Sequence, residues 1–284
     1  MSTGAASRNA RREHDLPELL ASVGLPADAT AEPAGGATGQ LWKVTAPGGP
    51  FALRTGSAFT IGRQQSVMGV AGRAGLPVPE VLRRVDMGFD AVLLLSWLPG
   101  ATVFDAVRTN PADAHRIGAL MGEAQRRLHA LAAPPALSAV VDGEGGGWPT
   151  SGVPPIEGLP QGTSLLHLDW HGLNLLVDGD RISGVLDWDN ARAGHPLLDL
   201  ARSHTLLTVE PTFATLQPYE RELLATLADG WATGYGEEAR SIPASCLAWA
   251  GRAMLADLAG RYADKPEVLA DLQRWTGSQE RLGS

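Results

Sequence analysis

LLHLDWHGLNLLVDGDRISGVLDWDNARAGHPLLDL, residues 165–200, is the stretch of sequence that decides the fold. Two apolar runs, 173–177 and 182–188, flank a turn of Asp, Gly and Asp at 178–180. Apolar runs on both sides of an Asp-Gly turn are typical of a β-hairpin. Folding the hairpin brings the polar residues that flank its two strands to one edge. These residues are Asp169, Asn174 and Asp187. Oxygen ligands gathered in this way suit a hard divalent cation, above all Mg²⁺ carrying nucleotide phosphates.

The spacing of these residues matches a known catalytic loop. His167, Asp169 and Asn174 follow the pattern H-x-D-x-x-x-x-N, and the return strand ends in Asp187-Trp188. Kinase-fold enzymes carry this pattern. The chain therefore resembles the aminoglycoside phosphotransferase and related small-molecule kinase superfamily. The resemblance is clear from about residue 30 to residue 201 and weak beyond it.

The resemblance implies an α+β, protein-kinase-like bilobal fold, with a small β-rich N-lobe and a larger, mainly helical C-lobe. We expect residues 1–14 to be a flexible tail, residues 15–97 to form the N-lobe and residues 98–284 to form the C-lobe. ATP, or GTP in its place, and Mg²⁺ are the implied cofactors. The implied activity is transfer of a phosphoryl group to an alcohol group of a small molecule.

The positions of this chain that match the family's catalytic loop imply the residues of the active site. Asp169 is expected to accept the proton of the acceptor hydroxyl as the catalytic residue, while Asn174 and Asp187 hold the metal. The segment 193–201 resembles the family's Asp-Pro-x-x-Asp-Leu-Ala segment, with His195 in place of the first Asp. Its retained acid, Asp199, is expected to hold the catalytic loop.

The remaining polar residues of the loop have less defined roles. His167 is expected to brace the loop. His171 and Asp189 are candidate substrate contacts. Asp189 lies two positions beyond the candidate metal ligand Asp187, so it could instead contact the metal or cap the following segment.

Nucleotide-binding residues are expected in the first lobe. A glycine-rich turn between two predicted strands can approach phosphates closely because its amides are unobstructed. This turn supplies Gly36, Thr38 and Gly39. The segment that resembles the linker between the lobes, where adenine binds, supplies Ser96, Trp97 and Leu98.

Two positions depart from the family pattern. Arg54 stands on the strand that normally supplies the basic residue for the phosphates, and Lys43 on the preceding strand is the alternative clamp. Arginine is not geometrically equivalent to lysine. Where the family has a Glu that pairs with the basic residue, this chain has Gln64-Gln65. A neutral amide can still accept a hydrogen bond from a guanidinium.

Two other classes of function fit part of the sequence. His167, Asp169 and His171 alternate along an extended segment and, with Asp187, could hold zinc or iron in a hydrolase-like centre. This alternative leaves Asn174 unexplained. The departures in the first lobe favour a second alternative, a non-catalytic binding protein on the kinase fold.

Composition and charge narrow the class of partner. The 284 residues are 44% hydrophobic and 19% charged, which is typical of a globular protein. A single cysteine, no apolar run of membrane-spanning length and no apolar signal core favour a cytoplasmic protein without a membrane partner. Residues 95–284 carry 14 basic against 23 acidic residues, a net charge of −9, which disfavours nucleic acid.

An acidic second lobe favours a cationic acceptor. The expected substrate is therefore an aminoglycoside or a peptide antibiotic of the viomycin and capreomycin type, so that the activity would confer antibiotic resistance. Neutral acceptors such as macrolides, sugars and metabolites remain open, as does the choice between monomer and homodimer. The Pro- and Gly-rich segment 132–161 either borders the acceptor site or is a disordered surface loop.

Overall fold

The computed structural model describes residues 15–34, 41–137, 153 and 156–283, and these residues form two compact units. The first unit contains residues up to 61 and 81–97, and the second contains 62–80 and 98–284. One point of division between the two units falls between residues 97 and 98. Residues 62–80, which are expected in the N-lobe from the sequence, group with the second unit in the structure.

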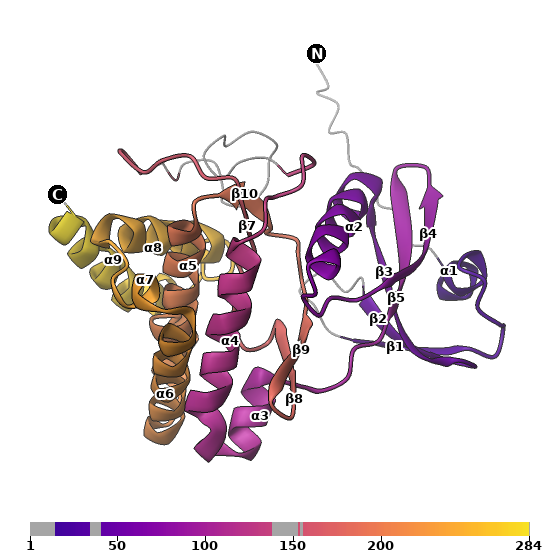
Figure 1. Ribbon diagram of the computed structural model, residues 1–284, viewed down its shortest axis with the longest axis horizontal. Coiled ribbons are helices and arrows are strands. Elements are labelled where there is room, and N and C mark those ends of the chain that lie inside the picture. Colours follow the sequence, from indigo (N-terminus) through magenta and orange to yellow (C-terminus); the bar gives the residue numbers. More distant parts are fainter. Residues whose placement is uncertain (1–14, 35–40, 138–152, 154–155, 284) are drawn as a thin grey trace, which may run out of the picture. The chain divides into compact units, whose positions relative to one another are not determined.

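The first unit is built on a five-stranded antiparallel sheet with the strand order β1-β2-β3-β5-β4 (Figure 1). The strands are β1 (Thr30–Pro33), β2 (Leu41–Ala46), β3 (Gly49–Ser57), β4 (Val81–Met87) and β5 (Asp90–Ser96). Helix α1 (Leu16–Ser22) packs on the sheet through Leu19 and Leu20, which contact Val44, Leu53 and Val92 in one buried cluster. Alternating apolar residues on β2 and β3 supply this core, as expected for a half-buried sheet.

Helix α2 (Ala58–Arg73) and the segment after it are tied to the second unit by backbone and side-chain hydrogen bonds. The amide of Val185 donates to the carbonyl of Pro77 at 2.8 Å, and Arg127 Nη2 donates to the carbonyl of Gly75 at 2.9 Å. These contacts join residues more than 50 positions apart along the chain. They explain why most of the helix belongs with the second unit.

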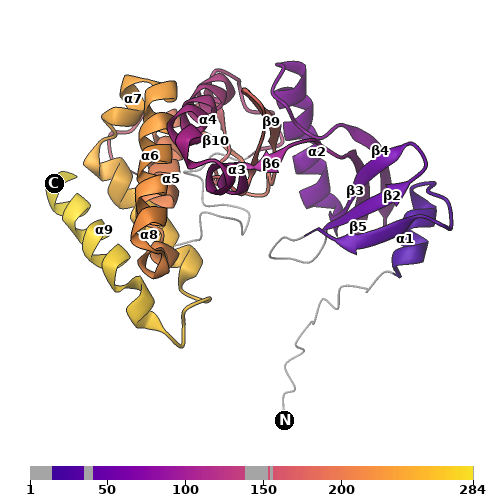
Figure 2. The ribbon, with the colours of Figure 1, turned by 90° about the horizontal axis from the view of Figure 1, so that it is seen from below.

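The second unit is mainly helical (Figure 2). Its helices are α3 (Val103–Thr109), α4 (Ala114–His129), α5 (Pro196–Thr208), α6 (Pro218–Tyr235), α7 (Glu237–Arg240), α8 (Ala244–Leu258) and α9 (Ala270–Gly283). Helices α4 and α6 lie side by side in both ribbon views. Four glycines make this approach possible, because a Cβ atom on any of them would overlap the backbone of the facing helix; they are Gly118 and Gly122 on α4, and Gly230 and Gly234 on α6.

Two small sheets flank the segment 167–174, which contains the candidate catalytic residue Asp169. The hairpin β8 (Leu175–Asp178) and β9 (Arg181–Val185) pairs with β6 (Ala101–Thr102), and β7 (Ser164–Leu166) pairs with β10 (Arg192–Gly194). The turn at Gly179 has φ 60°, a left-handed conformation that glycine adopts without strain. The hairpin expected from the sequence is therefore present, and the expected α+β arrangement, with a β-rich N-terminal part and a mainly helical C-terminal part, is confirmed.

Candidate active site

The catalytic segment begins with a residue in an unusual backbone conformation, Leu168, whose φ is 64°. Left-handed φ values are unfavourable for a residue with a Cβ atom and persist only where neighbouring groups hold them. The fully buried carboxylate of Asp199 does so here: Oδ2 accepts from the amide of His167 and Oδ1 from the amide of Leu168, each at 2.8 Å. Asp199 lies on the first turn of α5, so this helix fixes the backbone that precedes Asp169.

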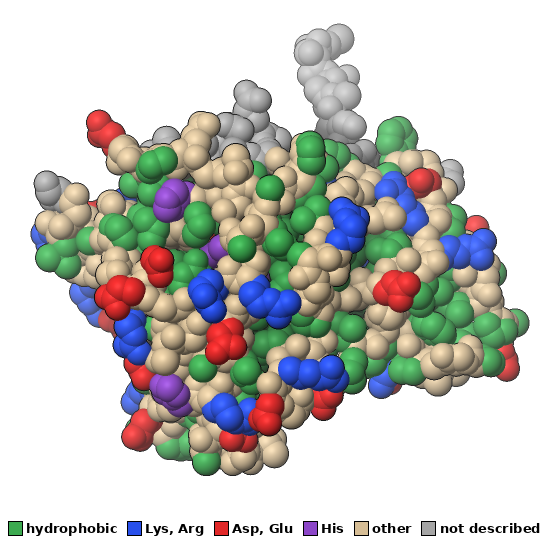
Figure 3. Space-filling model, in the orientation of Figure 1, with side chains coloured by type: hydrophobic (Ala, Val, Ile, Leu, Met, Phe, Trp, Pro, Cys, Tyr) green, Lys and Arg blue, Asp and Glu red, His purple; other side chains and the backbone are tan. Residues whose placement is uncertain are grey.

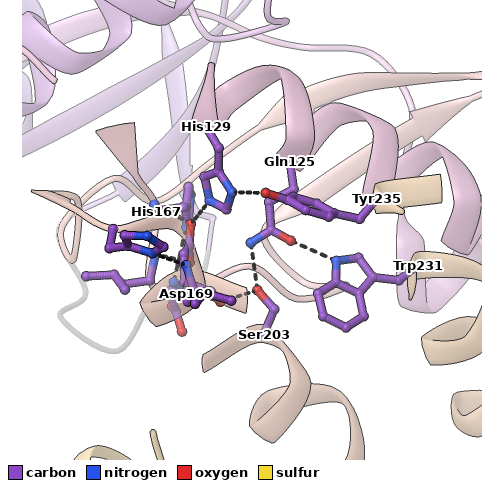
Figure 4. A network of polar contacts seen from close by, with 11 residues as sticks. Gln125, His129, His167, Asp169, Ser203, Trp231 and Tyr235 are labelled. Carbon is purple, nitrogen blue, oxygen red and sulfur yellow. Dashed lines mark hydrogen bonds and ion pairs between the residues drawn. The ribbon is translucent and has the colours of Figure 1, made fainter. Parts of the chain in front are cut away.

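Asp199 is in turn held by a buried network that reaches α4 and α6 (Figure 4). His129 Nε2 lies 2.9 Å from Asp199 Oδ2, and His129 Nδ1 lies 2.8 Å from the hydroxyl of Tyr235. Because a carboxylate only accepts, Nε2 donates to it. Burial alone would raise the pKa of Asp199, but hydrogen bonding and charge from His129 outweigh it and lower the pKa.

A second branch of this network starts at the neighbouring turn of α4. Gln125 Nε2 donates to Ser203 Oγ at 2.8 Å, and Ser203 Oγ donates to the carbonyl of Asp199 at 2.9 Å. Trp231 Nε1 donates to Gln125 Oε1 at 2.7 Å. The polar groups of this branch are thus satisfied inside the protein, which makes the network rigid.

We expect Asp199→Asn to lower the free energy of unfolding by about 2–4 kcal/mol. Asparagine leaves an amide NH₂ facing donors that now bind a carboxylate, so at least one buried donor loses its partner. Urea unfolding of the purified variant measures the change. Asp178→Asn is the matched control: its ion pair with Arg181 is exposed, so it should cost less than about 1 kcal/mol. Equal losses in both variants would contradict the buried role of Asp199.

Asp169 follows directly, and polar side chains surround its carboxylate. Asn174 Nδ2 donates to Asp169 Oδ2 at 2.9 Å and to the carbonyl of Asp169 at 3.0 Å. His171 Nε2 lies 3.5 Å from Asp169 Oδ1. Burial alone would raise the pKa of Asp169, but hydrogen bonding and charge from His171, with the charges of His167 and Arg202, lower it to about 2. The carboxylate is therefore ionised and able to accept a proton at neutral pH.

His171, a candidate substrate contact, is held toward Asp169. The amide of Leu173 donates to His171 Nδ1 at 3.3 Å, which leaves Nε2 on the side of the carboxylate. Phe104 of α3 stacks on the His171 ring with the centroids 6.3 Å apart. The same phenyl ring fills the space where Gly172 lacks a Cβ atom. Phe104 belongs to no motif, so sequence reasoning missed this contact.

The low pKa of Asp169 predicts a specific titration. The ionised form is favoured in the folded protein, so its stabilising effect is complete above the unfolded pKa of about 3.9 and disappears as the pH falls toward 2. We expect His171→Gln to raise the folded pKa of Asp169, because a neutral amide replaces the histidine. Carbonyl ¹³C NMR titration measures the midpoint. His115→Gln is the control, and an unchanged midpoint in His171→Gln would contradict the assignment.

The two candidate metal ligands lie on either side of the hairpin. The amide of Leu186 donates to the carbonyl of Asn174 at 2.9 Å, which brings the start of one strand next to the end of the other. Asp187 follows with φ 56° and an exposed side chain. Because Asn174 Nδ2 is engaged by Asp169, its Oδ1 remains available as a ligand. One carboxylate and one carboxamide oxygen fit Mg²⁺, which takes few protein ligands and completes its shell with water and phosphate oxygens.

Other residues expected near the metal have different neighbours. Gln64 Nε2 of α2 donates to Asp189 Oδ1, so this carboxylate is joined to α2. His167 is fully buried, and its Nε2 lies 2.8 Å from the carbonyl of Leu186. In the described ranges, no group of three His, Cys, Asp or Glu side chains is arranged to hold a metal. The hydrolase-like arrangement of His167, Asp169 and His171 therefore does not form there.

The candidate nucleotide residues are only partly described. Gly36, Thr38 and Gly39 lie outside the described residues. Arg54 lies on β3 opposite Leu93 of β5. Lys43 Nζ lies 5.2 Å from the centroid of the Trp97 ring, a cation–π contact within the first unit. Sequence reasoning treated the lysine and the tryptophan separately, and the structure brings them together.

Ser96 and Leu98 flank Trp97. Ser96 ends β5, where it pairs with Phe51. Leu98 belongs to the second unit and packs against Gly184 of the hairpin. The segment 96–98 therefore passes from one unit to the other.

Two acidic residues of the second unit, Asp229 and Asp257, are paired with basic side chains. Asp229 pairs with His115 at 3.2 Å and with Arg240 at 3.5 Å, and Asp257 pairs with the buried Arg202 at 3.1 Å. On the face shown in Figure 3, acidic and basic side chains are interspersed. Glu222, Glu237, Glu238 and Asp264 are exposed.

Comparison with known proteins decides the family. Residues 30–149 and 148–241 match the family model of the APH phosphotransferase enzyme family. The chain belongs to this family. The prediction of a phosphotransferase acting on a hydroxyl group is confirmed by this membership. No curated protein sequence matches the chain.

Solved structures of APH phosphotransferases share the fold. A thermostable mutant of aminoglycoside phosphotransferase APH(4)-Ia, in a ternary complex with ADP and hygromycin B, is 16% identical, with a TM-score of 0.63 over 95% of this chain and 99% of that chain. Macrolide 2'-phosphotransferase MphH from Brachybacterium faecium is 18% identical, with a TM-score of 0.52 over 90% of this chain and 97% of that chain.

None of the helices in the described segments has the length and hydropathy needed to cross a bilayer.

Proposed function

We propose that this APH phosphotransferase transfers the γ-phosphoryl group of ATP to a hydroxyl group of a small antibiotic, with Mg²⁺, and so confers resistance in the cytoplasm. The observation that carries the proposal is the ionised Asp169, whose carboxylate is oriented by Asn174 at 2.9 Å. A carboxylate in this state can align a hydroxyl with the γ-phosphate and take its proton. The first unit would bind the nucleotide, through Arg54 or Lys43 and the segment around Trp97, and GTP is an alternative donor.

Asn174 Oδ1 and Asp187 would hold Mg²⁺, which supplies positive charge to the phosphates when bound. Two hydrogen-bonding residues, Asn174 and Asp199, hold this part of the site in position. Asn174, a proposed metal ligand, also donates hydrogen bonds from Nδ2 to the proposed base Asp169, and so joins the base to the metal site. Asp199 fixes the backbone before the base. The protein thus contributes mainly positioning and charge, which are the main requirements of phosphoryl transfer.

Two classes of acceptor have support from different observations. The net charge of residues 95–284 supports a cationic antibiotic, an aminoglycoside or a peptide of the viomycin and capreomycin type. A neutral, more apolar acceptor such as a macrolide is supported by half-buried side chains around the cluster that contains Leu166 and Leu168. They are Val153, Ile156, Leu159, Leu197, Ile242 and Leu247. Val153, Ile156 and Leu159 belong to the segment 132–161, which would then border the acceptor.

The test is ADP release with Mg-ATP across a panel of aminoglycosides, capreomycin, viomycin, macrolides and hydroxyl-bearing metabolites, with mass spectrometry of the products. We expect a product heavier by one phosphoryl group from one antibiotic class, and none from the Asp169→Ala variant. Phosphorylation of a metabolite alone would reject the resistance role. Nucleotide binding without phosphorylation of any acceptor would instead favour a non-catalytic binding protein.

A further inference from the structure

An aromatic side chain outside every sequence motif, Phe104, lies against the loop that carries the candidate base Asp169. Its ring is stacked on His171, with the ring centroids 6.3 Å apart and the ring planes inclined by 25°. The amide of Phe104 donates to the carbonyl of Gly172 at 3.2 Å. The backbone and the side chain of one residue therefore hold two neighbouring positions of the loop.

Gly172 is the residue that shows how closely the ring and the loop fit. Its φ lies outside the left-handed region, so its backbone conformation does not require glycine. A Cβ atom at this position would overlap the Cδ1 and Cε1 atoms of Phe104. Gly172 is therefore required for the space that the phenyl ring occupies.

His171 carries the contact on to the base. The amide of Leu173 donates to His171 Nδ1 at 3.3 Å, and His171 Nε2 lies 3.5 Å from Asp169 Oδ1. Because the phenyl ring of Phe104 occupies the space beside the imidazole, it restricts rotation of His171 away from the carboxylate. The ring thus acts on Asp169 through His171.

Phe104 is held in place by its own neighbours in the second unit. Thr102 belongs to β6, which pairs with β8 of the hairpin, and its Oγ1 accepts from the amide of Asp105 at the start of α3. Val103 and Val107 are the buried residues that pack α3 into the unit. The half-buried Phe104 contacts the loop instead. Core packing of α3 therefore does not account for the phenyl ring.

We infer that Phe104 is a positioning residue for phosphoryl transfer. It holds His171 and the backbone at Gly172 in the geometry that directs the carboxylate of Asp169 toward the acceptor hydroxyl. This role rests on the proposed function, because it is exerted through the base. A displacement of about 1 Å at a reacting group can reduce the rate by about 100-fold. Loss of the ring should therefore lower kcat and leave the binding of the substrates nearly unchanged.

Steady-state kinetics with the acceptor found in the substrate panel test this role. We expect Phe104→Ala to lower kcat by about 10- to 100-fold, with the KM values for Mg-ATP and for the acceptor within about threefold. Phe104→Tyr keeps the ring and should stay within about threefold of the unmutated kcat. Phe104→Leu fills the space without an aromatic ring and should lower kcat at least about fivefold.

Val107→Ala is the matched control, because it removes buried side-chain volume from the same helix. It should lower the unfolding temperature while kcat stays within about twofold. A double-mutant cycle adds a second control. Gly172→Ala alone should lower kcat because its Cβ displaces the ring, whereas Gly172→Ala with Phe104→Ala should be about as active as Phe104→Ala alone.

The inference is overturned if Phe104→Ala keeps kcat within about twofold of the unmutated value, or if Val107→Ala loses as much activity as Phe104→Ala. Circular dichroism checks the folding of each variant. If Phe104→Ala does not fold, Phe104→Leu decides the outcome with the same twofold limit.

Hydrogen exchange distinguishes failure of this inference from failure of the proposed function. If the unmutated protein phosphorylates no acceptor, the proposed function fails, and the amide of Leu173 reports whether Phe104 holds the loop. This amide donates to His171 Nδ1, so it should exchange about tenfold faster or more in Phe104→Ala than in the unmutated protein. Equal exchange rates would overturn the inference.

Discussion

Asp169→Asn is expected to lower kcat by about 1,000-fold while the affinity for Mg-ATP stays nearly unchanged. The substitution keeps an oxygen that can accept from Asn174 Nδ2, so the local structure is preserved. It removes the negative charge and the ability to accept a proton from the acceptor hydroxyl. The loss therefore falls on the chemical step, and single-turnover phosphorylation of the acceptor found in the substrate panel measures it.

The control for this prediction is Asp178→Asn, which removes an exposed carboxylate from the turn of the same hairpin. It should leave kcat within about twofold, because surface charges of this kind contribute little. Nucleotide binding measured by calorimetry separates loss of chemistry from loss of the fold. If Asp169→Asn retained more than about a tenth of the activity, Asp169 would not be the base.

Gly122→Ala is expected to destabilise the protein by about 3 kcal/mol or more. Inside a helix, replacing glycine with alanine ordinarily stabilises by about 0.5–1 kcal/mol. Here the added Cβ would overlap the carbonyl oxygen of Trp231 and the amide of Tyr235, both of which belong to the backbone of α6. Backbone atoms cannot rotate away as a side chain can, so the helices must separate.

Thermal and urea unfolding of Gly122→Ala test this prediction. Gly260→Ala is the matched control, because a Cβ atom there meets nothing within 4 Å, and its effect should stay within about 0.5 kcal/mol. Combining Gly122→Ala with Gly234→Ala should prevent folding, since domains are stable by only about 5–15 kcal/mol. Stability equal to that of the unmutated protein would mean that α4 and α6 are not in close contact.

The sequence predicted the parts of the fold whose signals are local. The hairpin was predictable because the Asp-Gly turn and the apolar runs lie within a dozen residues. The signal for helix α4 (Ala114–His129) is equally local, because its buried apolar residues Ile117, Met121, Ala124 and Leu128 recur at helical spacing. The contact of α4 with α6 was not predictable, since a glycine inside a helix normally weakens it. Only the facing backbone shows why Gly122 is required.

The same distinction between local and tertiary signals applies to the residues of the candidate site. Asp169, Asn174 and Asp187 could be named as candidates from the sequence because the motif fixes their spacing around one hairpin. The partner of Gln64 could not be predicted, because a guanidinium partner was expected and the amide instead donates to Asp189, 125 positions away. Phe104 carried no signal in the sequence, since its contact with His171 arises only from tertiary structure.

The hydrogen bonds of Asp199 also determine how the catalytic segment exchanges hydrogen with solvent. The amides of His167 and Leu168 donate to a fully buried carboxylate, which is itself held by His129. Neither amide can meet water unless α5 moves away from the loop. In deuterium oxide these two amides should therefore exchange as slowly as the centres of α4 and α6, although they lie in a loop. The loop thus opens together with the helical core.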